Sequence, residues 1–299
     1  PGQCNVMGNS NYVYRDDLRI CSDGERLVGL CELDGTCPEG YACQETPACV
    51  LDAQRSNFSI VVSNPSTQTT ATVTLESPDG TTLTQDVPPG GLAKLAPYQG
   101  GATDASIDGS GVFRSAFHLM STSPIVAYQF NPLDNEGVFS NDGSLLLPSH
   151  ALGSTYLVMG LPTIDRRPYG HPYSGYASGV ATEPGATEIE VISGAAIRAG
   201  PRQPRLEARM SHRFTLQQGD VLNLEADGRG DLTGTRIASV GSQTPFAVFT
   251  GHESTLISDR ERSGRDDPLC CGDHVEEQLF PVETWGDRFA VGRSNGRED

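Results

Sequence analysis

The sequence predicts an all-β protein, with two related multi-stranded β units behind a small disulfide-rich N-terminal module. Three observations support this fold class. The 299 residues include 34 glycines and 20 prolines, a density of turn formers that is typical of many short strands. Six of the eight cysteines fall within the first 49 residues. The rest of the chain repeats itself, which predicts tandem sandwich-like units or a propeller-like closed array.

The predicted N-terminal module covers residues 1–52. So short a segment buries little apolar surface, and closely spaced cysteines indicate a disulfide framework that stabilises it. A zinc site is the alternative, but C-x-x-C spacing is absent and no His lies in the segment. The sequence does not choose among the pairings of the expected disulfide cysteines, which are Cys4, Cys21, Cys31, Cys37, Cys43 and Cys49.

Oxidised cysteines predict a secreted or cell-surface protein. No apolar run approaches the roughly 18 residues that a membrane-spanning helix needs. No basic-then-apolar leader opens the sequence, so we expect the mature form of an exported protein. The net charge of −17 repels phosphate backbones and anionic lipids, which argues against nucleic acid and membrane surfaces as partners.

Residues 53–299 form the predicted β domain. Residues 70–77 and 82–87 alternate apolar and polar side chains on either side of a Pro-Asp-Gly-Thr turn, and we expect them to form a hairpin. Convincing helices are absent, and residues 148–156 could hold one short helical turn.

The β domain contains two repeats, at about residues 56–160 and 174–292. Four blocks recur in the same order, such as 83–97 with 213–227. Turn residues recur with them: Pro65 with Pro184, Pro124 with Pro245 and Gly153 with Gly286. Each repeat would hold four or five strands.

The end of the second repeat leaves three interpretations open. Residues 285–291 match the end of the first repeat, which leads directly into the second. A further unit once followed, or the last strand completes a sheet of the first unit. In the third interpretation, an open last strand pairs with a neighbouring molecule.

Three stretches resemble a known family. They are residues 130–158, with the core S-N-D-G-S-L-L-L-P, residues 231–251, and residues 270–291, with G-D-H-V-E-E-Q-L-F-P-V. These stretches are similar to the N-terminal domain family of IgGFc-binding protein. The resemblance implies an extracellular β-rich domain for binding or scaffolding, and it implies no catalysis. Immunoglobulin binding is the historical name of one member and is not carried over.

The stretch from Cys270 to Gln278 gathers thiols and acidic groups around His274. Cys270 and Cys271 are expected to be oxidised, with partners in the N-terminal module or in another molecule. A metal or acid-base site is one interpretation of the remaining groups. The favoured interpretation is that Asp273 or His274 caps a turn before a strand at Leu279, because the H-E-x-x-H and P-C-x-x-C motifs are absent.

One basic stretch stands out in this acidic chain. We expect it to project as a loop, and the favoured interpretation is a solvated loop with local acidic partners. The functional hypothesis is that it contacts an acidic face of another copy or an acidic glycan. The possible assembly contacts are Arg198, Arg202, Arg205, Arg209 and Arg213.

Residues 134–142 offer the hard oxygen ligands that calcium prefers, from Asp134, Asn135, Glu136, Asn141 and Asp142. The EF-hand spacing is absent, so a solvated turn is the default and no cofactor is predicted.

The predicted function is that of a non-enzymatic extracellular adhesion or scaffold protein. Its partners would be other copies of itself, other surface or matrix proteins, or glycans, and it would assemble into a surface layer or filament. G-x-S-x-G, P-loop and dinucleotide-binding motifs are absent. The alternative is a carbohydrate-binding module or polysaccharide-active enzyme, with a sugar platform formed by Tyr156, Tyr169, Tyr173 and Tyr176. The favoured interpretation of these tyrosines is a linker that packs its rings on the flanking sheets.

Overall fold

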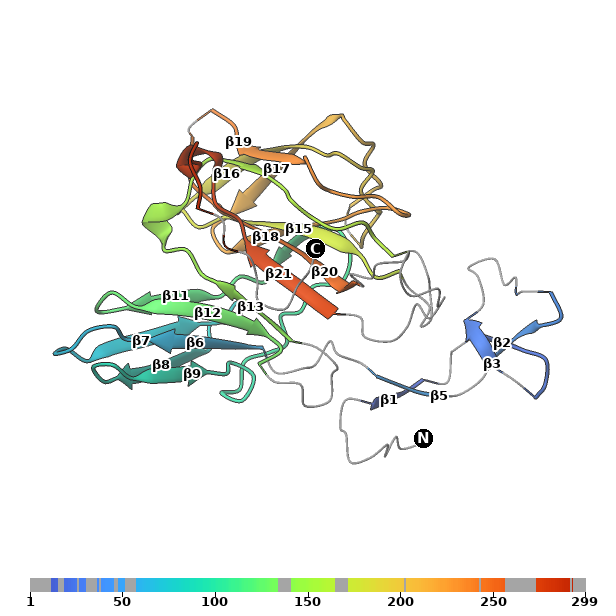
Figure 1. Ribbon diagram of the computed structural model, residues 1–299, viewed down its shortest axis with the longest axis horizontal. Helices are drawn as coiled ribbons and strands as arrows, with labels where there is room; N and C mark the ends of the chain where they lie inside the picture. The colour runs from blue at the N-terminus through green and yellow to red at the C-terminus, as the bar shows by residue number, and fades with distance from the viewer. Residues whose placement is uncertain are drawn as a thin grey trace.

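The described residues of the computed structural model form strands and two short 3-10 helices (Figure 1). The described residues are 12–15, 19–25, 27–30, 37, 39–45, 48–51, 58–133, 141–164, 172–201, 203–241, 243–255, 273–290 and 292. Within these ranges, no helix has the length and apolar character that a bilayer crossing requires.

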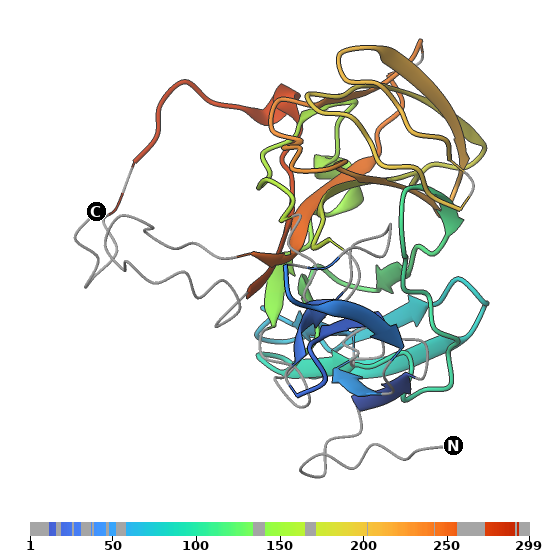
Figure 2. The ribbon, with the colours of Figure 1, turned by 90° about the vertical axis from the view of Figure 1, so that its right-hand side faces the viewer.

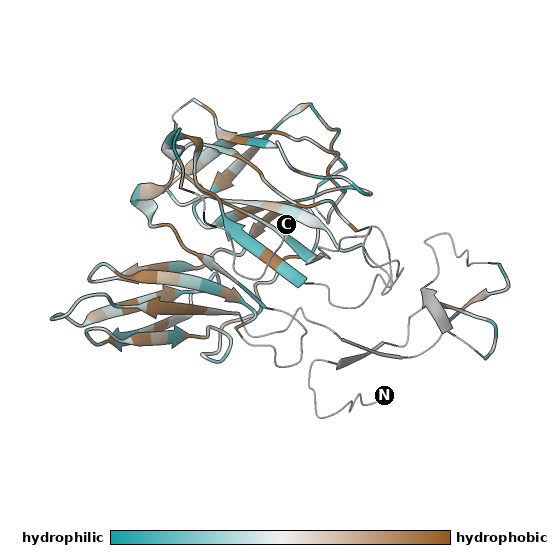
Figure 3. Cartoon of the chain, in the orientation of Figure 1, coloured by the Kyte–Doolittle hydropathy of each residue, from teal (hydrophilic) through white to brown (hydrophobic). Residues whose placement is uncertain are grey.

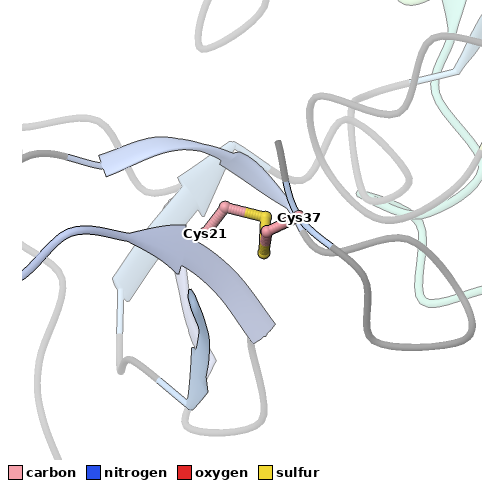
Figure 4. Close-up of a disulfide and its surroundings, with 2 residues drawn as sticks. All are labelled: Cys21 and Cys37. Carbon is pink, nitrogen blue, oxygen red and sulfur yellow. A yellow bond between two sulfur atoms is a disulfide. The ribbon is translucent and has the colours of Figure 1, made fainter. Parts of the chain in front are cut away.

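The N-terminal module holds two small sheets, which lie to one side of the main body (Figure 1). One sheet pairs β1 (Tyr12–Arg15) with β5 (Ala48–Leu51), and the other has the order β3 (Leu27–Leu30), β2 (Arg19–Ser22), β4 (Ala42–Glu45). Cys21 of β2 forms a disulfide with Cys37 (Figure 4), and Cys43 is also disulfide-bonded. These bonds are consistent with a small disulfide module. The other predicted disulfide cysteines lie outside the residues whose side chains are described: Cys4, Cys31, Cys49, Cys270 and Cys271.

The first sandwich packs a four-stranded sheet on a three-stranded sheet. The four-stranded sheet has the order β13 (Asp142–Leu145), β12 (Val126–Asn131), β6 (Ser59–Ser63), β9 (Leu92–Leu95). The three-stranded sheet has the order β11 (His118–Ser121), β7 (Ala71–Glu76), β8 (Thr82–Val87). Val62, Val73 and Leu75 are completely buried between the sheets because alternate residues of each strand face inward.

The predicted hairpin is confirmed in the pairing of β7 with β8. Gly80 takes a φ of 84° in the connecting turn, which favours glycine. The Asp79 carboxylate accepts hydrogen bonds from the amides of Thr103 (2.7 Å) and Thr81 (2.8 Å). These bonds, the Thr103 amide first, hold the Asp79 pKa far below its usual range.

The second sandwich packs a five-stranded sheet on a four-stranded sheet. The five-stranded sheet has the order β10 (Gly111–Arg114), β18 (Asp220–Glu225), β15 (Gly175–Val180), β20 (Ala247–Thr255), β21 (Asp273–Gln278). The four-stranded sheet has the order β14 (Thr155–Leu157), β19 (Arg236–Ser239), β16 (Ala186–Ile192), β17 (Ser211–Gln217). Its core includes the completely buried Tyr156, Ile189 and Phe246.

The two sandwiches share one topology, as the fold-class prediction of two related β units requires. The order β13, β12, β6, β9 corresponds to β21, β20, β15, β18, and the order β11, β7, β8 corresponds to β19, β16, β17. A 3-10 helix that starts after a proline follows the last strand of each set: η2 (Ser149–Ala151) after Pro148 and η3 (Val282–Thr284) after Pro281.

Two strands break this equivalence. Strands β10 and β14 belong to the first repeat in sequence, but they lie in the sheets of the second sandwich, beside β18 and β19. In sequence, residues 111–120 precede Pro124 as the stretch around Ile237 precedes Pro245. In the structure β19 corresponds to β11, and β10 has no counterpart among the described strands.

Candidate functional site

The joint between the two sandwiches is formed by β13 and β21, which are equivalent edge strands. Figure 1 shows β21 crossing close to the end of β13. The amide of Glu276 donates to Asp142 Oδ2 (2.6 Å), and the amide of Gln278 donates to Ser144 Oγ (2.7 Å). Side chains of the first sandwich therefore accept hydrogen bonds from backbone amides at the sheet edge of the second.

The hydrogen bonding is reciprocal. Gln278 Oε1 accepts from the amide of Leu147 (2.7 Å), and Glu276 Oε1 accepts from Gln129 Nε2 (3.1 Å). Both β21 side chains are buried, and Figure 3 shows β21 as mostly hydrophilic with one hydrophobic band. Buried polar groups are costly unless each has a partner, so this network specifies one arrangement of the two sandwiches.

Acidic groups at the joint control the titration of its neighbours. Burial lowers the pKa of His274, but the nearby carboxylate of Glu276 and the charge of Asp142 outweigh it, so the pKa is raised. The imidazole Nε2 lies 3.9 Å from the Glu276 carboxylate. Burial, and then the charge of Glu276, raises the pKa of Tyr176 well above its usual value. The Tyr176 hydroxyl lies over Gly251, where a Cβ atom would come within 2.4 Å of it.

His252 is completely buried beside the joint. Its Nδ1 accepts from the amide of Ser254 and its Nε2 lies 3.1 Å from the carbonyl of Pro162. These partners fix the neutral tautomer with the proton on Nε2. Burial, as the largest influence, lowers the pKa of His252. Both ring nitrogens are occupied, so this histidine holds the inter-unit segment in place.

A second buried polar cluster surrounds Glu225 at the end of β18. Its carboxylate accepts from the amide of Gly109 (2.8 Å) and from Ser174 Oγ (3.2 Å), and it forms an ion pair with Arg198. A Cβ atom on Gly200 would lie 1.8 Å from the Ser110 carbonyl oxygen, so only glycine fits there. The cluster fixes the β10 region of the first repeat to the second sandwich.

The predicted assembly arginines have varied surroundings. Arg198 pairs with Glu225, Arg205 pairs with Asp227 (2.6 Å), and Arg213 lies 3.7 Å from Glu190. Arg209 is exposed, with a φ of 62°. Arg202 lies outside the described residues. Three of the five therefore have acidic partners in their own chain, and Arg209 is exposed at the surface.

The prediction for Asp273 and His274 was wrong. They do not precede a strand at Leu279; they begin β21, which ends at Gln278. The strand tolerates three acidic residues because it pairs with β20 on one side and contacts Asp142 and Ser144 on the other.

The predicted calcium ligands are only partly described. Asp134, Asn135 and Glu136 lie outside the described residues. Asn141 Nδ2 donates to the Leu133 carbonyl (3.3 Å), and Asp142 belongs to the joint. Within the described ranges, no group of three or more His, Cys, Asp or Glu side chains could hold a metal ion.

The predicted sugar platform does not form as a set. Tyr156 is completely buried and donates a hydrogen bond to the Phe246 carbonyl (2.6 Å). Tyr173 pairs through its backbone with Ile164, and Tyr169 lies outside the described residues. A shallow groove between β8 and β9 is lined by residues such as Leu83, Lys94 and Gln99, and none of its lining residues is aromatic.

Residues 142–299, just over half of the chain, match the family model described as IgGFc binding protein. The chain belongs to the IgGFc-binding protein family. No curated protein sequence and no solved structure matches it. The family is of a binding type and its domains are extracellular, which agrees with the disulfide in the N-terminal module.

The IgGFc-binding match begins at Asp142, the first residue of β13, and includes β21. Two of the three stretches that resemble the family therefore contain the two strands of the joint. Sequence reasoning missed this role of Asp142, Glu276 and Gln278. A partial signal was present, because each strand carries polar residues at alternate positions, which then share one face: Asp142 and Ser144 in β13, and His274, Glu276 and Gln278 in β21.

Proposed function

We propose that the protein is a secreted, non-enzymatic scaffold that acts in adhesion and assembles as a repeating subunit of a surface layer or extracellular filament. One observation carries the proposal: strands β10 and β14 leave the first repeat and complete the sheets of the second sandwich. A unit whose sheets are completed by strands of the preceding unit is suited to serial assembly. The same strand exchange can recur from one unit to the next.

The joint supports this function mechanically. The reciprocal bonds of Glu276 and Gln278 with the first sandwich hold the two units in one orientation. Units with a fixed relative orientation add up to a regular array, whereas freely jointed units do not.

Charge favours particular partners. The net charge of −17 makes copies repel at long range, so association would need local complementarity and would strengthen as salt screens the repulsion. The proposed partners are other copies and other surface or matrix proteins, with acidic glycans at the exposed Arg209.

Electron microscopy and analytical ultracentrifugation of the purified chain would test this function. Concentration, salt and calcium should each be varied, because calcium is the one ion that the predicted ligand loop would suit. We expect ordered oligomers or filaments that grow with protein concentration. Dispersed monomers under every condition would contradict self-assembly.

A further inference from the structure

The edge of β19 in the second sandwich is covered by β14. The Val158 amide donates to the Thr235 carbonyl and the Ser239 amide donates to the Ser154 carbonyl, both at 2.9 Å. Tyr156 of β14 is 0% exposed. It lies opposite Ile237 of β19 and packs edge-on against Phe246, with ring centroids 5.0 Å apart.

The equivalent edge in the first sandwich is open. Among the described strands, β11 pairs with β7 alone. The residues equivalent to Ile237 and Phe246 are Leu119 and Ile125, and both are only partly buried against their core. No described strand therefore covers the first sandwich at the place where Tyr156 closes the second.

The open edge of β11 has backbone groups ready to pair. The Thr122 amide donates to the Thr72 carbonyl (3.0 Å), so the amide of Thr122 faces β7. Backbone groups alternate in direction along an antiparallel strand. The amides and carbonyls of Leu119 and Ser121 therefore point away from β7, as those of Ile237 and Ser239 point toward β14.

A segment equivalent to β14 follows the second sandwich. Gly286 follows η3 as Gly153 follows η2, so residues 287–290 correspond to 154–157. Phe289 takes the place of Tyr156 and is 77% exposed. Figure 2 shows this red segment extending away from both sandwiches.

We propose that the open edge of β11 binds residues 287–290 of a second copy as an antiparallel strand, with Phe289 covering Leu119 and Ile125. The inference rests on the proposed self-assembly and names the contact that produces it. It repeats, between molecules, the pairing of β14 with β19 inside one chain.

Charge complementarity supports a second copy as the occupant. Within one chain, Glu283 of η3 accepts hydrogen bonds from the amide (2.9 Å) and hydroxyl (2.6 Å) of Ser154. The equivalent of Glu283 is His150 of η2, and the equivalent of Ser154 is Asp287. The exchanged strand would therefore place a carboxylate beside an imidazole that can donate to it.

The direct test uses the full chain carrying Phe289→Ser as the acceptor, the molecule whose β11 edge binds the strand. Without Phe289, its own residues 287–290 should not compete for that edge. The probe is a labelled synthetic peptide of residues 285–292, WGDRFAVG. We expect saturable binding in fluorescence anisotropy and slower amide exchange in residues 118–121. A peptide with Ser in place of Phe should bind roughly 10- to 100-fold more weakly, because burying a Phe side chain stabilises a complex by that factor.

A matched acceptor control adds Ser121→Pro, which removes one outward amide and should weaken peptide binding. Ser121 is exposed and its amide does not face β7, so the melting temperature of this variant reports whether folding is intact. Phe280→Ser is the control for the donor. Phe280 is also exposed but lies outside residues 287–290, so wild-type assembly should persist in this variant.

Peptide binding with slower amide exchange in β11 supports the proposal. It does so even if the wild-type chain stays monomeric and the proposed self-assembly is wrong. Absence of binding, or protection only at another edge such as β9, overturns it. Wild-type assembly that survives Phe289→Ser also overturns the proposed contact, while leaving self-assembly standing.

Discussion

The two sandwiches have the same strand order but differ in how their edges are covered. The first has sheets of four and three strands, and the second has sheets of five and four. The additional strands, β10 and β14, are supplied by the first repeat. The large, completely buried side chains Tyr156, Phe246 and Ile237 all lie in the second sandwich. A repeat of this kind is completed by its neighbour.

The joint shows a second difference from an ordinary pair of linked domains, because equivalent edge strands form it. Strands β13 and β21 are equivalent, and each sits at the edge of its own sheet. They meet through buried polar side chains, which give the family motifs a structural role. The predictions below alter one sandwich, or one contact between the two, and compare it with its counterpart.

The largest expected effect comes from the cores. Phe246→Ala should lower the free energy of unfolding by about 4 kcal/mol, because it empties a completely buried site. Ile125→Ala at the equivalent, half-covered site should cost less than about 2 kcal/mol. Calorimetry of the two variants measures the difference. Equal losses would mean that the first sandwich is as well closed as the second.

The next effect concerns the contact of the β10 region with the second sandwich. Arg198→Ala should cost roughly 3 kcal/mol, because it leaves the buried carboxylate of Glu225 without its ion pair. Arg209→Ala, at an exposed residue of the same stretch, should change stability by less than about 0.5 kcal/mol. Denaturant titration of both variants checks this, and similar midpoints would contradict the role of the pair.

A smaller effect is expected at the joint. Gln278→Leu should cost about 2 kcal/mol, because the partly buried amide of Leu147 loses its acceptor. The first and second sandwiches should also unfold in two resolved transitions, in place of one. Differential scanning calorimetry measures both effects. Gln129→Leu removes a single, longer hydrogen bond to Glu276 and should cost less stability than Gln278→Leu.

Repeats, hairpins and turns could be predicted from the sequence because local residues determine them. Pro-Asp-Gly-Thr specifies the β7–β8 turn, and the glycines of Asp-Gly-Arg-Gly, residues 227–230, favour a turn before the next strand. That strand is β19, and Gly228 takes a φ of 61°. Gly230 does not take a positive φ; a Cβ atom there would lie 2.9 Å from the Asp227 carbonyl oxygen.

The pairing of β10 and β14 with strands of the second sandwich could not be predicted in the same way. Residues 111–114 and 155–157 have ordinary strand patterns, and such patterns do not encode which sheet a strand joins. The buried ion pair of Glu225 with Arg198 was also missed, because its members are 27 residues apart and meet only in the folded chain. An arginine-rich stretch in an acidic chain suggested surface contacts, whereas tertiary packing uses Arg198 internally.

The smallest expected effect is at the hydroxyl of Tyr156. Tyr156→Phe should cost about 1 kcal/mol at neutral pH by removing the bond to the Phe246 carbonyl. Burial raises the pKa of Tyr156 to about 12. The stability linked to this shift is therefore complete below pH 10 and is lost as the pH rises toward 12. Thermal melts between pH 9 and 12 should fall less steeply for this variant than for Tyr128→Phe, whose ring is exposed.

Hydrogen exchange of the monomer at high dilution tests the central claim most directly, because it compares equivalent amides on β11 and β19. The amides of Ile237 and Ser239 face β14 and should exchange only on global unfolding. Those of Leu119 and Ser121 face the open edge and should exchange at near the rate of unstructured peptides. Equal, strong protection of both pairs in the monomer would contradict the claim that the second sandwich is closed by the first while the first stays open.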